Sequence, residues 1–142
     1  QRSGRMSDSE VSHFIGTLPY MSPEQIKDGC SIDHRTDIYS LGVTLYQMLT
    51  GERPFKGSDQ AIYRAIANYH PPEPSKLNPK VPKELDIITM KAMEKKKENR
   101  YLTGAEMAED IHRYLRGEPI LSLPISKWAR FFRKIRGYFL WF

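Results

Sequence analysis

The chain has 142 residues, of which 39% are hydrophobic and 27% charged, so it has about the length of one domain and can form a core. A wholly disordered chain is therefore excluded. The net charge is +5, but residues 127–142 carry five basic residues and no acidic one. Removing these five from the 22 basic residues leaves 17, equal to the 17 acidic residues, so residues 1–126 are neutral. A basic surface on the body, typical of nucleic-acid-binding domains, is not indicated.

The cysteine count and the two ends of the chain indicate whether to expect a disulfide, a signal peptide or a longer parent protein. The single cysteine, Cys30, cannot form an intrachain disulfide. The N-terminus has no apolar run of the signal-peptide type, and no stretch reaches the roughly 18 apolar residues of a membrane-spanning helix. Because the chain begins at Gln1 rather than Met and stops within the apolar run 138–142, we expect it to be a piece of a longer protein.

The first half of the chain predicts a loop, a capped helix and a buried helix. Residues 1–13 are polar and serine-rich, which indicates an exposed loop. Ser22-Pro23-Glu24-Gln25 has an N-cap serine, a proline at the first helical position and a glutamine that completes a capping box. Residues 37–50 are apolar on most sides and precede Gly51, so they predict a central helix that is buried nearly all round.

Three amphipathic helices are predicted after this central helix, over 59–68, 82–95 and 104–116. The last has a capping box of Thr103 and Glu106 at its start and Gly117 at its end. Four prolines in 69–81 predict a long irregular connector. No segment alternates convincingly as a strand would, so the fold class is mainly α.

Several motifs, in order and with suitable spacing, resemble the protein kinase family. Residues 16–24 (GTLPYMSPE) resemble the end of its activation segment, and residues 37–42 (DIYSLG) the start of the central helix of its large lobe. Residues 51–55 (GERPF) and 98–101 (ENRY) resemble two later turns of that lobe. The form of 16–20 is similar to the serine/threonine branch, and 117–120 (GEPI) to bacterial receptor-like members.

The resemblance implies a partial large lobe without an N-terminal lobe. The resemblance assigns residues 1–117 to the lobe and leaves residues 118–142 as a tail. Within the lobe, residues 1–24 would be the activation segment and P-E motif, and residues 25–117 a helical subdomain. The glycine-rich loop, the ATP-pairing lysine and D-F-G are all missing from the chain. His34-Arg35-Thr36-Asp37 follows the P-E motif and has an extra residue, so it is not the catalytic loop.

A parent kinase would therefore transfer phosphoryl groups from ATP, with Mg²⁺, to protein Ser or Thr hydroxyls, whereas this chain binds neither cofactor and is predicted to be inactive alone. Its partners would be protein substrates and the missing upstream half of the kinase. The alternative is a non-catalytic, membrane-associated helical module that keeps the shape of the lobe for docking.

The resemblance also implies roles for individual residues, none of them catalytic. The substrate-positioning residues would be Gly16, Thr17, Leu18, Pro19 and Tyr20, although an ordinary turn closed by proline is the alternative. Glu24 and Arg100 would form a buried ion pair rather than two separate surface charges. Asp37 would anchor the catalytic loop, and it could equally be an acidic residue favoured at a helix N-terminus. Phosphorylation of the activation segment would fall on Ser9, Ser12 or Ser7.

Two further groups of polar residues carry plainer interpretations. The run Lys95-Lys96-Lys97, between Glu94 and Glu98, predicts a solvated turn. The histidines have no ligand-type spacing to one another or to Cys30, so no metal site is expected.

The tail has the pattern of an interfacial helix. Aromatic and aliphatic residues recur at helical spacing with basic residues largely on other faces, and the candidate membrane contacts are Trp128, Arg130, Phe131, Phe132, Arg133, Lys134 and Arg136. This pattern predicts contact of 127–142 with an anionic membrane, on its cytoplasmic side. A helix packed on the lobe and a linker to a spanning helix are the alternatives. Nucleic acid is not an expected partner, because the neutral body offers no supporting surface.

Overall fold

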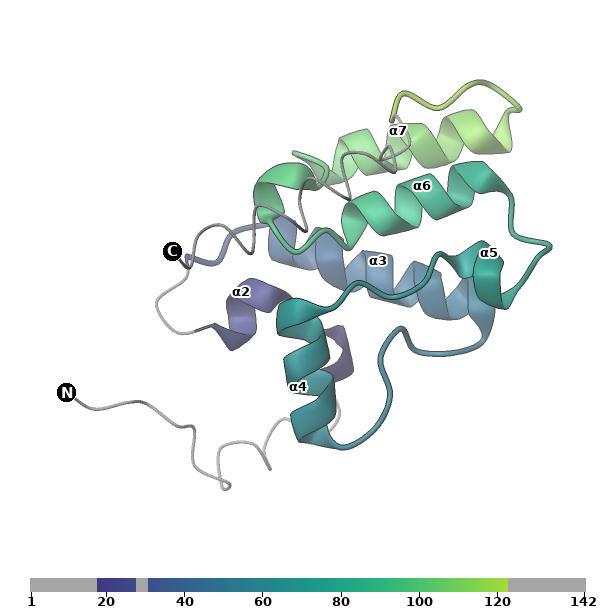
Figure 1. The fold of residues 1–142 in the computed structure, drawn as a ribbon. Helices are drawn as coiled ribbons and strands as arrows, with labels where there is room; N and C mark the ends of the chain where they lie inside the picture. Colours follow the sequence, from purple (N-terminus) through teal and green to yellow (C-terminus); the bar gives the residue numbers. More distant parts are fainter. Residues whose placement is uncertain (1–17, 28–30, 123–142) are drawn as a thin grey trace, which may run out of the picture.

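The computed structural model describes residues 18–27 and 31–122 (Figure 1). Several predictions concern residues outside these ranges. They are the roles of Gly16 and Thr17, the phosphorylation sites Ser7, Ser9 and Ser12, and the membrane contacts within 127–142.

The described residues form helices and no strand, which confirms the mainly α fold. The elements are η1 (Leu18–Tyr20), α2 (Pro23–Ile26), α3 (Arg35–Thr50), α4 (Asp59–Asn68), α5 (Pro74–Leu77), α6 (Lys83–Ala92), η2 (Lys97–Asn99) and α7 (Gly104–Leu115). The connector 69–81 is not wholly irregular as predicted, because Pro74 occupies the first position of α5. Helix α6 ends at Ala92, three residues earlier than predicted.

Helix α3 lies at the centre and packs against η1, α5 and α6 (Figure 1). Gly42 permits the close approach of α6, since a Cβ atom at this position would lie 2.8 Å from the Cβ of Ala92 and 2.9 Å from the Cγ of Met93. At the other end of α6, Asp86 accepts a hydrogen bond of 2.8 Å from the backbone N–H of Ser75 and thereby fastens α5. The sequence prediction of a central helix is correct in position.

One face of α3 is not buried as predicted. Asp37, Leu41, Thr44 and Met48 are exposed, and Leu41 and Met48 have relative exposures of 52% and 77%. Their spacing of i, i+4, i+7 and i+11 places them in one stripe along the helix. We call these four residues the α3 stripe. The described elements pack on the other sides of α3, so none of them covers it.

Three apolar clusters hold the helices together, and one of them packs Tyr39, Val43 and Tyr46 of α3 against Met93. Another joins α3, α6 and α7 through the buried residues Ile38, Ile88, Ala92, Tyr101 and Met107. The third joins η1, α2 and α4 through Leu18, Ile26, Ile62 and Ile66. In Figure 1, α2 and α4 lie together on one side of α3, while α6 and α7 lie on another. The end of the activation-segment motif is thus fixed by a cluster of its own.

Candidate functional site

The residues implied in substrate positioning are fastened to the central helix. Leu18 and Pro19 are buried. The Tyr20 hydroxyl donates a hydrogen bond of 2.6 Å to Oε1 of Gln47, and the Ser40 hydroxyl donates one of 2.8 Å to the Tyr20 carbonyl oxygen. Because Gln47 and Ser40 both belong to α3, η1 cannot move independently of that helix.

The turn after η1 brings Glu24 into the interior. Ser22 precedes α2, its backbone N–H donates to Oε1 of Gln25 at 2.9 Å, and Pro23 opens the helix, so the predicted capping box forms. The first turn of α2 then points Glu24 toward Arg100, which lies in the loop after η2. The carboxylate receives a bidentate pair of hydrogen bonds, from Nη1 to Oε1 at 2.5 Å and from Nη2 to Oε2 at 2.7 Å.

All five N–H donors of Arg100 have acceptors. Besides the two bonds to Glu24, the guanidinium donates to the backbone oxygens of Glu94, Arg35 and Lys95. The side chain is fully buried and lies over the ring of Tyr39, 5.0 Å from its centre. Arg100 therefore ties α2, the start of α3 and the loop after α6 to one point.

Burial by itself would raise the pKa of Glu24, but the hydrogen bonds from Arg100 and Thr36 and the charge of Arg100 together hold it below its ordinary value. Thr36 donates to Oε1 of Glu24 at 2.9 Å. The carboxylate is thus ionised and fully engaged in neutral solution. The role of Glu24 in this structure is to hold α2 against Arg100 and Thr36, and its carboxylate is not available as a proton acceptor.

Asp37, the implied anchor of a catalytic loop, is not brought to any partner that the structure describes. It is exposed in the first turn of α3 and belongs to the α3 stripe. His34 lies one position before α3 and contacts the carbonyl oxygen of Leu102 at 2.6 Å through Nε2, so it faces α7 rather than the stripe. The motif His34-Arg35-Thr36-Asp37 therefore does not form a constellation.

The lysine run 95–97 is not the solvated turn predicted from the sequence. Lys95 and Lys97 are half-buried, and only Lys96 is exposed. The Nζ of Lys97 donates to the carbonyl oxygen of Ser31 at 2.8 Å and lies 3.3 Å from Oδ2 of Asp33. Sequence reasoning missed this because the burial comes from residues some 30 to 70 positions away, and no local periodicity signals it.

The start of the tail is joined to the helical body. The backbone N–H groups of Leu121 and Ser122 donate to the carboxylate of Asp110 on α7, at 2.7 Å and 3.3 Å. Tyr101 donates to the same carboxylate at 2.8 Å, and Asp110 is buried. Residues 121 and 122 are therefore fixed to α7.

The described residues contain no cluster of three or more His, Cys, Asp or Glu side chains suited to a metal ion. Within the same ranges, every helix is too short or too polar to cross a bilayer.

Comparison with known proteins places these features in a family. Residues 3–115 match the protein kinase domain family. The chain is 43% identical over 117 residues to the serine/threonine-protein kinase PknB of Mycobacterium tuberculosis, which covers 80% of this chain and 18% of that protein. It is 47% identical over 107 residues to a probable serine/threonine-protein kinase PknB of Bifidobacterium longum, covering 72% of this chain and 15% of the relative. A probable serine/threonine-protein kinase of Streptomyces coelicolor, SCO3848, is 39% identical over 116 residues, or 81% and 17% of the two chains.

The chain spans less than a fifth of the length of these relatives. The part that matches contains the activation-segment motif, the Glu24–Arg100 pair and the central helix α3, and all the named relatives are bacterial. On this sequence and structural basis, the chain belongs to the bacterial serine/threonine protein kinase family, as part of the helical lobe of the kinase domain.

Proposed function

We propose that this chain is the substrate-side part of a bacterial receptor-like serine/threonine kinase and is inactive by itself. The parent reaction would transfer the γ-phosphoryl group of ATP to Ser or Thr hydroxyls of proteins. The observation that carries the proposal is an asymmetry around α3. The described end of the activation-segment motif, from Leu18, packs against α3 and α4, whereas the α3 stripe is exposed.

The α3 stripe has the composition of a covered surface. Leu41 and Met48 are large apolar residues, and Asp37 at the end of the same stripe can accept backbone hydrogen bonds from a neighbouring loop. We infer that the upstream half of the kinase covers this stripe and brings its catalytic loop to Asp37. In the parent protein, ATP and Mg²⁺ would supply the phosphoryl group and neutralise its charge.

We expect ATP and Mg²⁺ to be held by the upstream part of the parent kinase rather than by the described residues of this chain. Within them no three carboxylate or imidazole groups gather, and the buried carboxylate of Glu24 is saturated by Arg100 and Thr36. What this chain contributes is the fixed position of η1, through Tyr20 and Gln47, beside which a protein substrate would lie.

The proposal predicts no phosphotransfer from Mg-ATP to a protein substrate by the purified 142-residue chain, and activity once the polypeptide encoded upstream is added or fused. Met48→Asp should abolish this complementation because it places a charge in the covered stripe, without loss of the fold, since Met48 is exposed. Leu115→Asp on α7 is the matched control, because Leu115 is 70% exposed and lies outside the stripe. Radiolabelled ATP measures phosphotransfer, and circular dichroism shows whether each variant keeps its helical fold.

Phosphotransfer by the chain alone would overturn the proposal. An upstream coding sequence without H-R-D and D-F-G motifs would instead favour a non-catalytic helical module.

We also propose that residues 127–142 contact an anionic membrane on its cytoplasmic side, which rests on the sequence pattern of the tail. Flotation with vesicles that contain phosphatidylserine should recover the 142-residue chain, and neutral phosphatidylcholine vesicles should not. Because each basic residue contributes about 1 kcal/mol near an anionic surface, Arg133→Gln should weaken binding about fivefold. Lys80→Gln, an exposed lysine of the body, is the control. Equal binding to the neutral vesicles would refute the proposal.

A further inference from the structure

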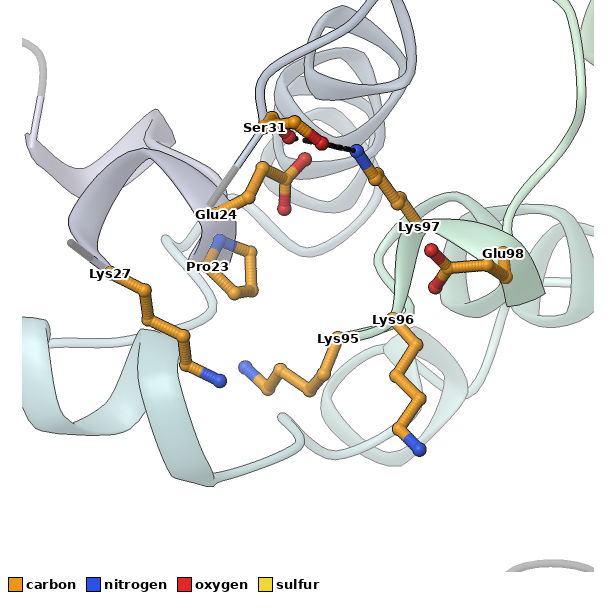
Figure 2. A pocket seen from close by; sticks show the side chains of 8 residues that line it. All are labelled: Pro23, Glu24, Lys27, Ser31, Lys95, Lys96, Lys97 and Glu98. Atoms are coloured by element: carbon orange, nitrogen blue, oxygen red, sulfur yellow. Dashed lines mark hydrogen bonds between the residues drawn. The ribbon is translucent and has the colours of Figure 1, made fainter. Parts of the chain in front are cut away.

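A pocket of about 220 Å³ lies between α2 and the turn that leads from α6 into η2 (Figure 2). It is separate from the α3 stripe. Eight residues line it: Pro23, Glu24, Lys27, Ser31, Lys95, Lys96, Lys97 and Glu98. Four of the eight are lysines, so the pocket has an excess of positive charge.

The ammonium groups of Lys27 and Lys95 point toward each other (Figure 2). Among the described residues, neither these two lysines nor Lys96 forms a salt bridge, whereas Lys97 is paired with Asp33. Two lysine ammonium groups that face each other without a salt bridge to a described carboxylate repel. The free energy of this arrangement falls if an anion lies between them.

Lys95 is held in place rather than free to turn away into solvent. Its Nζ donates to the carbonyl oxygen of Ala65 at 3.2 Å and lies 4.7 Å from the centre of the Phe55 ring. Since an ammonium group has three N–H donors, two remain for a ligand. Burial, reinforced by the charges of Lys27 and Arg100, lowers the pKa of Lys95 to about 7, and Glu94 acts in the opposite direction.

The two carboxylates of the pocket do not neutralise these lysines. Glu24 is engaged by both terminal nitrogens of Arg100. Glu98 lies on the side of Lys97, across the pocket from the tips of Lys27 and Lys95 (Figure 2).

We propose that Lys27 and Lys95 bind a phosphoryl dianion in this pocket, presented as free phosphate or as a phosphoserine or phosphothreonine side chain. A phosphoryl group has close to two negative charges at neutral pH and three strong acceptor oxygens, so it can satisfy both ammonium groups at once. A carboxylate has one charge and neutralises only one of them. The proposal does not depend on the chain being part of an active kinase.

The test is a titration of the 142-residue chain with inorganic phosphate at constant ionic strength, followed by NMR of ¹³C-labelled lysine side chains. Saturable shifts are expected at Lys27 and Lys95, together with a rise in the pKa of Lys95, because a bound anion favours the ammonium form. Lys27→Gln and Lys95→Gln should each weaken binding about tenfold, the effect of losing one charge-assisted hydrogen bond. Lys80→Gln, at an exposed lysine outside the pocket, should leave it unchanged.

Lys27 is exposed, so its substitution separates loss of the ligand from loss of the fold. A second titration compares inorganic phosphate with a phosphoserine peptide, and uses the same peptide unphosphorylated as the control. Tighter binding of the phosphopeptide than of phosphate assigns the pocket to a protein-borne phosphoryl group, and equal binding assigns it to free phosphate. The proposal is overturned if phosphate produces no saturable shift, if acetate binds as tightly, or if Lys27→Gln binds phosphate like the parent chain.

Discussion

Replacement of Arg100 by methionine is expected to lower the free energy of unfolding by about 3–5 kcal/mol, because it leaves a buried carboxylate without its partner. Glu24 would lose both hydrogen bonds from the guanidinium, and three backbone oxygens would lose their donor. Urea denaturation of the 142-residue chain, followed by circular dichroism, measures the change.

A matched control is Lys56→Met, which removes the cation of the exposed pair with Glu52. Both side chains of that pair are about half exposed or more, so its loss should cost less than about 1 kcal/mol. The double variant Glu24→Leu/Arg100→Met should lose less stability than the two single variants together, since neither charge is left unpaired. If Arg100→Met unfolds at the same urea concentration as the parent chain, the pair does not hold α2 to the lobe.

The second large effect is expected at Asp110, where an alanine should leave three hydrogen-bond donors without their acceptor. Asp110 is buried and accepts from Tyr101, Leu121 and Ser122. Each buried polar group that is left unpaired costs about 1–3 kcal/mol. The thermal midpoint should therefore fall clearly, whereas Glu109→Ala, at the adjacent and partly exposed position, should change it little. Equal midpoints for the two variants would contradict this role.

The same two sites predict how stability depends on pH. Hydrogen bonds to Glu24 and to Asp110 outweigh the effect of burial, which by itself raises a carboxyl pKa, and leave both pKa values below the ordinary one. The unfolded chain therefore binds protons more readily than the folded chain. Their stabilisation is complete above the unfolded pKa values, about 4, and is lost as the pH falls through the folded values. Asp110→Asn should reduce this loss, which denaturation at a series of acidic pH values would measure.

Local patterns in the sequence account for the helices and for their ends. Thr103 accepts a hydrogen bond from the backbone N–H of Glu106 at the start of α7, and Gly51 adopts a φ of 74° at the end of α3. Such caps act within one turn of the chain, so the residue order alone specifies them. The resemblance to the protein kinase family likewise implied that Glu24 and Arg100 would meet, although 76 positions separate them.

The sequence misled where burial depends on distant segments. The apolar residues of α3 predicted a helix buried nearly all round, with part of its cover expected from the upstream part of the lobe. In the structure Leu41 and Met48 face outward because the described neighbours of α3 pack only on its other faces. The hydrophobicity of a residue indicates that its burial is favourable, but it does not indicate which part of the chain buries it.

The lysine run shows the opposite error. Three consecutive charges predicted solvent, but Ala65 and Phe55, from other parts of the chain, enclose Lys95. The sequence by itself therefore determined the longer helices, most of their ends and the family to which the chain belongs, since these depend on local propensity and on the order of motifs, although it did not indicate the short helix α5. Only the tertiary structure decided which charges are paired, which face of α3 is open and where Lys27 and Lys95 meet, because electrostatic and packing energies depend on distances between segments far apart in the chain.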